Sequence, residues 1–219
     1  MLRLPLNQIR HVLCLGAHAD DIEIGCGGTI LKLLDQNPTL RVTWVVCAAE
    51  GPRIAEAQHA AQHFLGAAAP QAEILIRDFP DRYFPQAWSE IKDFFCELSD
   101  QLRGPDAPDL VFTHRLEDRH QDHRVLAELT WNAFRNHLIL EYEIPKYEGD
   151  LGQPNLYVGL SEQIVDLKCQ AIVECFPSQR SHPWFDQETF RSLMRIRGLE
   201  IHSPSRYAEA FYCRKAILE

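Results

Sequence analysis

The chain of 219 residues is long enough for one substantial hydrophobic core and contains no stretch that looks like a linker, so residues 1–219 are predicted to form a single domain. Its 22 basic and 31 acidic residues give a formal net charge of −9, which argues against nucleic-acid binding and a membrane surface and favours a small neutral or cationic substrate. Residues 1–10 lack the apolar core of a signal peptide, and no later run reaches the roughly 20 apolar residues that cross a bilayer, so a cytoplasmic location is expected. The seven cysteines contain no CxxC pair and lie mostly in apolar runs, which predicts reduced core thiols.

Apolar runs and helical patterns alternate up to about residue 137. The runs suited to strands are residues 11–16, 40–47, 73–76 and 109–113. The helical patterns are residues 27–34, 53–65 and 88–102, and a polar segment at 114–124 that opens a further helix. This alternation predicts an α/β fold with a Rossmann-like, doubly wound, mostly parallel sheet of order 3-2-1-4-5. The C-terminal third is less regular, with a strand at 138–144, a helix at 160–173 and a strand or edge segment at 206–214.

Polar side chains appear where two of the predicted strands end. His18, Asp20 and Asp21 follow the first strand, and residues 117–123, with two histidines and several carboxylates, follow the fourth. Charged groups at the end of a buried strand are costly to desolvate unless they face a cleft, a partner or a metal. Because strands 1 and 4 are neighbours at the switch point of such a sheet, we expect the two segments to meet in one crevice.

These residue types predict a metal site. Catalytic zinc takes three ligands from His, Asp and Glu and keeps a fourth position for water, whose pKa falls to about 7. We assign His18, Asp21 and His123 as the ligands and Asp20 as the uncoordinated general base. His120, three residues before His123 near a helix start, is expected to face the reacting carbonyl oxygen. Either motif alone is compatible with a solvated turn or an exposed helix start, and the pair favours the metal.

The glycines near the first strand suggest a competing hypothesis, a nucleotide-binding turn. Gly16, Gly25, Gly27 and Gly28 lie between a strand and a helix, but their spacing does not match GxGxxG. The residues between Gly16 and Gly25 include an imidazole and three carboxylates, which would repel a pyrophosphate. A nucleotide-dependent enzyme is therefore disfavoured.

Three motifs together resemble the PIG-L/LmbE-like family of zinc-dependent N-deacetylases. The motifs are Ala17-His18-Ala19-Asp20-Asp21, Gly25-Cys26-Gly27-Gly28-Thr29 and His120-Gln121-Asp122-His123. Shorter matches extend along most of the chain, as far as residues 207–211. The paired HxDD and HxDH motifs are the specific part of this resemblance.

The resemblance implies a role for each matching residue. It implies the zinc ligands already assigned, Asp20 as the general base, and His120 as the group that stabilises the oxyanion or protonates the leaving amine. Asp122 would orient His120 from behind. The chain departs from the family pattern at Ala19, where proline is common, and at Ile22, where glutamate is common. Neither departure removes a ligand.

Other polar residues have two interpretations each. Arg53 either binds a substrate hydroxyl, phosphate or carboxylate, or forms a surface ion pair with Glu56. His59 and His63 have the spacing of a metal pair, but no HExxH glutamate accompanies them, and a solvated or partly packed helix face is favoured. The remaining histidines in loop-like contexts either line the pocket rim or are structural, and they are His114, His182 and His202.

The sequence thus predicts a Zn²⁺-dependent hydrolase that removes an N-acyl group, most simply acetyl, from an amino sugar or a sugar-containing conjugate. Other divalent transition metals fit the same nitrogen and oxygen ligands. The alternatives are an amidohydrolase acting on a thiol conjugate or an antibiotic-type amide, and a metal- or sugar-binding module without turnover. The expected partner is a small N-acetylated sugar-type molecule, with no nucleic acid and no membrane, and a homo-oligomer is compatible with the sequence.

Overall fold

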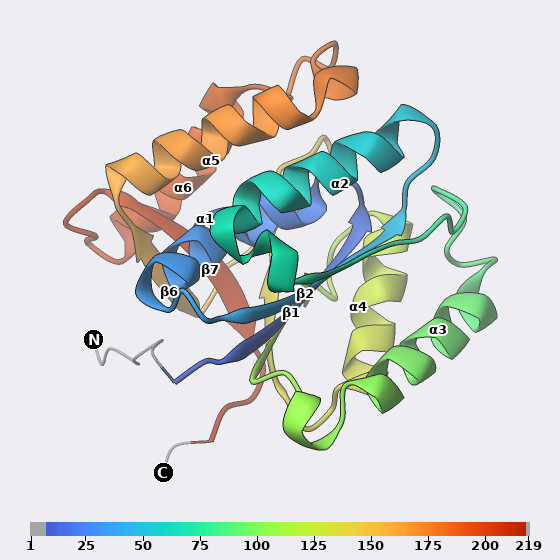
Figure 1. The fold of residues 1–219 in the computed structure, drawn as a ribbon. Coiled ribbons are helices and arrows are strands. Elements are labelled where there is room, and N and C mark those ends of the chain that lie inside the picture. Colours follow the sequence, from blue (N-terminus) through green and yellow to red (C-terminus); the bar gives the residue numbers. More distant parts are fainter. Residues whose placement is uncertain (1–7, 218–219) are drawn as a thin grey trace.

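One mixed sheet runs through the centre of the molecule (Figure 1). In the computed structural model, which describes residues 8–217, seven strands form this sheet in the order β3-β2-β1-β4-β5-β7-β6. The strands are β1 (His11–His18), β2 (Arg41–Ala48), β3 (Glu73–Ile76), β4 (Leu110–His114), β5 (Leu138–Tyr142), β6 (Leu156–Leu160) and β7 (Tyr207–Cys213). The first five strands are parallel and lie in the order 3-2-1-4-5, and both observations confirm the prediction. β7 pairs antiparallel with both β5 and β6 and extends the sheet beyond that prediction.

Helices cover both faces of the sheet. The helices are α1 (Asp21–Gln36), α2 (Pro52–Leu65), α3 (Trp88–Gln101), α4 (Gln121–Ala133), α5 (Glu162–Cys175) and α6 (Gln187–Glu200), with short 3₁₀ turns at Gly66–Gln71, Gly104–Asp106 and Pro177–Gln179. In Figure 1, α1, α2, α5 and α6 lie on one side of the sheet and α3 and α4 on the other. This two-sided cover explains why β1 reads as a continuous apolar run, because both of its faces are buried.

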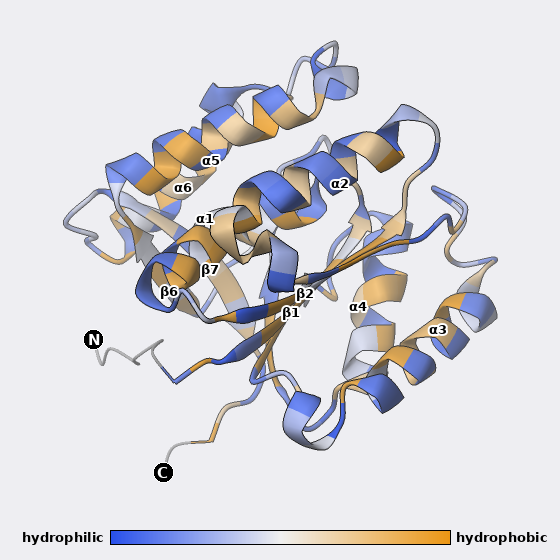
Figure 2. Cartoon of the chain, viewed as in Figure 1, coloured by the Kyte–Doolittle hydropathy of each residue, from blue (hydrophilic) through white to orange (hydrophobic). Residues whose placement is uncertain are grey.

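Alternate residues of the strands supply two separate cores. Cys14 and Trp44 face the layer of α1, α2 and α5, whereas Leu13 and Val45 face the layer of α3 and α4. Figure 2 shows the resulting pattern, with hydrophobic residues along the central strands and hydrophilic residues on the outer helix surfaces. Within residues 8–217, no helix combines the length and the apolar character required to cross a bilayer.

The glycine-rich stretch after His18 is helical, which corrects the prediction of a turn with a helix from residue 27. α1 begins at Asp21, and its glycines lie inside the helix. A Cβ on Gly25 would stand 2.2 Å from the ring of Tyr142, and one on Gly27 would stand 2.6 Å from Phe64. Both glycines therefore permit close packing of α1, which overrides their low helix propensity.

The C-terminal third is more regular than predicted. The sequence does not predict β6 or α6. Earlier in the chain, residues 115–120 of the predicted polar segment form a loop between β4 and α4. The other predicted elements begin and end close to the observed ones. β6 is short and half-buried, so its apolar pattern is weak, whereas α6 buries Phe190 and Met194 at helical spacing.

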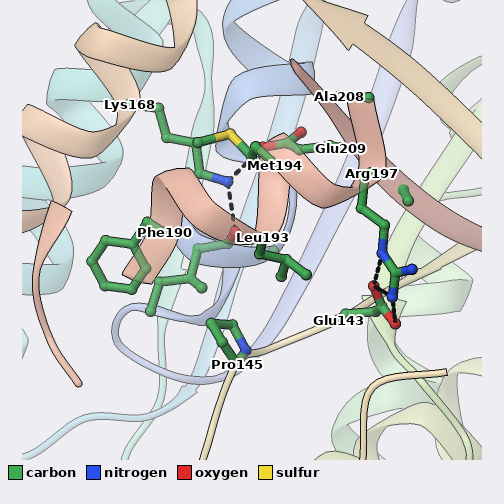
Figure 3. A pocket seen from close by; sticks show the side chains of 12 residues that line it. Glu143, Pro145, Lys168, Phe190, Leu193, Met194, Arg197, Ala208 and Glu209 are labelled. Carbon is green, nitrogen blue, oxygen red and sulfur yellow. Dashed lines mark hydrogen bonds and ion pairs between the residues drawn. The ribbon is translucent and has the colours of Figure 1, made fainter. Parts of the chain in front are cut away.

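Two ion pairs, drawn in Figure 3, hold this last third against α1 and β5. The Lys168 ammonium lies 2.6 Å from Glu209 and donates to the carbonyl of Ile24, while Arg197 lies 2.8 Å from Glu143. The cavity between these pairs measures about 20 Å³, room for a water molecule and far too little for a sugar. Breaking one partner of such a pair is costly because the other charge remains buried.

Candidate metal centre

The turn between β1 and α1 carries the first half of the site. β1 ends at His18, and Asp20 is the residue that precedes the first turn of α1. The Asp21 carboxylate accepts the backbone N–H of His18 at 2.6 Å, which closes the turn tightly. β4 lies next to β1, so the loop that follows β4 and the start of α4 reach the same sheet edge, as the predicted strand order requires.

The three side chains predicted as metal ligands approach one another closely. Nδ1 of His18 lies 3.2 Å from Nε2 of His123 and 3.3 Å from Oδ2 of Asp21. Nε2 of His123 lies 3.6 Å from Oδ1 of Asp21. Ligands bound about 2.1 Å from a tetrahedral ion are about 3.4 Å apart. The spacing of these atoms therefore fits the ligand shell of one small cation.

The outer nitrogen of each histidine meets a carboxylate. Nε2 of His18 lies 3.1 Å from Asp122 and 3.1 Å from Asp81, and Nδ1 of His123 lies 3.0 Å from Asp118. Metal-binding histidines commonly hold such a carboxylate on the nitrogen that faces away from the ion. Burial and the neighbouring His114 lower the pKa of His123 to about 3, so the imidazole is neutral, as a metal ligand requires. The donor set thus fits a divalent transition metal.

Asp118 is a site residue that sequence reasoning missed. Its Oδ2 meets His123 Nδ1 and also the Lys146 ammonium at 2.8 Å, and its Oδ1 accepts the backbone N–H of His120 at 2.7 Å. Burial acts to raise the pKa of Asp118, but the hydrogen bond from His123 and the charge of Lys146 outweigh it and hold this pKa well below its usual value, so the carboxylate is ionised. Lys146 also binds Asp150 at 2.9 Å, which ties the loop after β5 to the site.

For His114, a place at the pocket rim and a structural role were both left open, and its position in a strand and its burial favour the structural role. It is the last residue of β4, fully buried, with its ring stacked on His123 at 3.8 Å between centroids. Its Nε2 lies 3.0 Å from Asp21 Oδ2 and 3.1 Å from the N–H of Ala17. His114 therefore lies beneath the proposed ligands, where it supports two of them. The clue in the sequence was its position at the end of the fourth apolar run.

Arg53 reaches Asp20 from α2. Its guanidinium lies 3.0 Å from Oδ1 of Asp20 and 3.8 Å from Glu56, so the predicted ion pair with Glu56 is the longer of its two carboxylate contacts. Burial raises the pKa of Asp20, and the charge of Arg53 opposes that rise. Oδ2 of Asp20 has no hydrogen-bond partner among residues 8–217. Asp20 therefore has one oxygen that is hydrogen-bonded to Arg53 and one oxygen without a hydrogen-bond partner among the described residues.

His120 occupies the N-cap of α4. Its Nδ1 accepts the backbone N–H of Asp122 at 3.3 Å, so the hydrogen of the neutral ring is on Nε2. The rings of His120 and His123 lie 4.5 Å apart between centroids. The Asp122 carboxylate meets His18 rather than the His120 ring that it was expected to orient. The contact between Asp122 and His120 runs through the backbone instead.

The loop between β3 and α3 closes over the site. Asp122 accepts the backbone N–H groups of Arg82 at 2.6 Å and Phe84 at 3.1 Å, and this loop also carries Asp81. Arg82 has φ of 68°, a left-handed conformation that a non-glycine residue adopts at a cost. Gln121 donates to the Arg82 carbonyl at 3.1 Å. These bonds from the start of α4 hold the strained loop in place.

Other candidates lie elsewhere or serve packing. His182 and His202 are exposed, and His59 and His63 lie on the outer face of α2. Glu23, by contrast, is fully buried, and neither of its carboxyl oxygens has a partner among residues 8–217. Burial raises the pKa of Glu23 well above its usual value, which favours the uncharged carboxylic acid. None of the seven cysteines forms a disulfide in the structure.

The sequence of the chain is similar to a known protein family and to a bacterial protein. Residues 13–134 match the protein family PIG-L, described as GlcNAc-PI de-N-acetylase. The Escherichia coli K12 protein named "Uncharacterized deacetylase YaiS" is 26% identical over 176 residues, which is 76% of this chain and 90% of YaiS.

Solved structures share the fold at lower identity. The N,N'-diacetylchitobiose deacetylase of Pyrococcus horikoshii, in complex with an inhibitor, is 21% identical with a TM-score of 0.69, covering 97% of this chain and 86% of that one. The 4-carboxy-2-hydroxymuconate hydratase GalB of Pseudomonas putida is 17% identical with a TM-score of 0.70, covering 96% and 98%. A deacetylase and a hydratase therefore use the same fold, so the reaction must be inferred from the site.

Proposed function

Since the chain belongs to the PIG-L family, we propose that it is a metal-dependent hydrolase that removes an N-acetyl group from an amino sugar or a sugar-containing conjugate. The observation that supports this best is the convergence of His18, Asp21 and His123 at 3.2–3.6 Å, with Asp20 beside them. Bound there, Zn²⁺ would act as a Lewis acid on the amide carbonyl and lower the pKa of the attacking water.

Asp20 is the proposed general base. Arg53 holds its Oδ1, which orients the carboxylate and leaves Oδ2 to take the proton of the water. The raised pKa that burial gives Asp20 suits a group that accepts a proton and later releases it to the leaving amine. A positioned base of this kind contributes about 10²- to 10⁴-fold to the rate.

His120 is the proposed oxyanion donor. Because its Nδ1 accepts the N–H of Asp122, its Nε2 carries the hydrogen that can be donated to the developing negative charge on the substrate oxygen. Burial lowers the pKa of His120, which keeps the ring in this neutral form. One such donor is worth about 10²- to 10³-fold in kcat. The carboxylates around His18 and His123 hold the ligands and take no part in the proton transfer.

The test is acetate release from N-acetylglucosamine derivatives, measured together with metal content. We expect the wild-type protein to release acetate and Asp20→Asn to lose about 10²- to 10⁴-fold of kcat with its metal retained. Asp35→Asn, the same substitution on an exposed residue of α1, is the matched control and should remain active. No release from any acetylated sugar, or an Asp20→Asn variant as active as the control, would contradict the proposal.

A further inference from the structure

A second group of metal-binding side chains lies where α2 and α5 pack together. His59 and His63 stand four residues apart on the exposed face of α2, and Cys175 is the buried last residue of α5. One nitrogen of each imidazole and the Cys175 sulfur all lie within 4.8 Å of one another. The two helices run side by side in Figure 1 and are in contact. The sequence shows the spacing of a metal pair here but favours a solvated or partly packed helix face.

None of these three side chains has another polar partner. Within residues 8–217, the two imidazoles and the Cys175 thiol form no hydrogen bond and no ion pair. The two imidazole rings lie 6.2 Å apart between centroids, and His63 also lies 6.4 Å from the ring of Phe64. Their ring nitrogens are therefore available to a ligand from solvent.

We propose that His59, His63 and Cys175 form a second metal site, which binds Zn²⁺ or a cation of similar softness. Two imidazole nitrogens and a thiolate match the preference of Zn²⁺, whereas Mg²⁺ and Ca²⁺ take oxygen ligands. Ligand atoms around a tetrahedral ion are about 3.4–3.8 Å apart, a distance that small rotations of the exposed imidazoles would reach from the observed spacing. Three protein ligands leave a fourth position to solvent, so the ion at this site is exchangeable.

Binding requires that the thiol lose its proton. Burial raises the pKa of Cys175 to about 11, and the charge of Glu174 adds to this rise, so the sulfur is protonated when no metal is present. As the metal–sulfur bond forms, the thiol proton is released to solvent. The affinity of the site therefore increases with pH, as expected for a thiolate ligand.

An ion at this position would stabilise the segment that supports Arg53. The ring of Phe176, which follows Cys175, lies 5.5 Å from the Arg53 guanidinium. Ser178 donates from its backbone N–H and its hydroxyl to Glu56, at 2.9 Å and 2.6 Å. A metal that joins the end of α5 to α2 thus fixes the chain directly before Phe176, whose ring contacts Arg53, the partner of Asp20.

Cobalt substitution tests the site by spectroscopy. Co²⁺ bound to a thiolate gives a near-ultraviolet charge-transfer band, and the predicted site at His18 contains no sulfur ligand. We expect this band when the metal-free protein is titrated with Co²⁺, and its loss in Cys175→Ser. His63→Gln, on the exposed face of α2, should lose the band as well, and it does not endanger the fold.

Two controls separate this site from other binding. His18→Gln, which removes a ligand of the first site, should retain the band, and so should Cys96→Ser, because Cys96 is an exposed cysteine on α3. Absence of the band in the wild-type protein, or an undiminished band in Cys175→Ser, would overturn the second site. Acetate release is measured separately, so failure of the proposed deacetylase activity leaves this result unaffected.

Discussion

Replacing Asp118 by Asn is expected to weaken metal binding without removing a ligand. The Asp118 carboxylate accepts three groups, with Oδ1 on the N–H of His120 and Oδ2 on both His123 Nδ1 and Lys146. An asparagine has a single acceptor oxygen, so its NH₂ must face either the His120 N–H or the His123 and Lys146 donors. With the NH₂ toward His123, nothing keeps the hydrogen of His123 on Nδ1 and Nε2 free for the ion; with the oxygen toward His123, a neutral amide replaces the charged carboxylate and its NH₂ opposes the His120 N–H.

The magnitude follows from the contacts that are lost. Substituting the carboxylate behind a metal-binding histidine costs about 10- to 100-fold in metal affinity. This corresponds to about 1.4–2.8 kcal/mol of binding free energy. We expect Asp118→Asn toward the upper end, because Lys146, with a side chain only 12% exposed, loses one of its two carboxylate partners in the same step.

The assay is competition for Zn²⁺ against a chromophoric chelator. Asp150→Asn is the matched control, because it alters the other carboxylate on Lys146 and leaves the contact between Asp118 and His123 intact. Wild-type affinity in Asp118→Asn would refute the proposed positioning of His123. An equal loss in both variants would refute it too, because the effect would then come from the loop after β5.

Three further substitutions test the fold and the base. Lys168→Met should lower the free energy of unfolding by about 3–5 kcal/mol in chemical denaturation, because it leaves the buried Glu209 carboxylate without its counterion; an unchanged free energy would contradict this. Gly25→Ala should cost about 1–3 kcal/mol by the same measurement, because its Cβ would stand 2.2 Å from Tyr142; an unchanged midpoint would contradict this packing. Arg53→Met should lower kcat for acetate release by up to about 100-fold with the metal retained, because a charge-assisted hydrogen bond is worth about 1.5–3 kcal/mol. An unchanged kcat would exclude a role of Arg53 in holding the proposed base.

Sequence prediction and structure differ most clearly at the glycine-rich stretch that follows β1. The sequence predicts a helix that begins only at Gly27, because glycine is a poor helix former, but α1 begins at Asp21 and includes Gly25, where Tyr142 occupies the space of a Cβ. The residue that fills this space is distant in sequence, so local helix propensity predicts the start of the helix wrongly. β6 is not predicted because its five residues give a weak pattern and its place in the sheet depends on β7.

The amino-acid sequence by itself determined the order of the first five strands and the two segments that meet at the sheet edge. Both follow from local information, because buried parallel strands are continuous apolar runs and crossovers are right-handed. The three predicted ligands, His18, Asp21 and His123, lie together as that order requires.

Only the tertiary structure decided which groups surround those ligands. Asp81 and Asp118 reach the two histidines from loops, His114 lies beneath them, and Arg53 contacts Asp20 from another helix. No spacing along the chain encodes these contacts, because each depends on how a loop or helix packs on the sheet. The physical reason is that motifs of a few residues place side chains along one element, whereas hydrogen bonds between elements depend on the position of the whole chain.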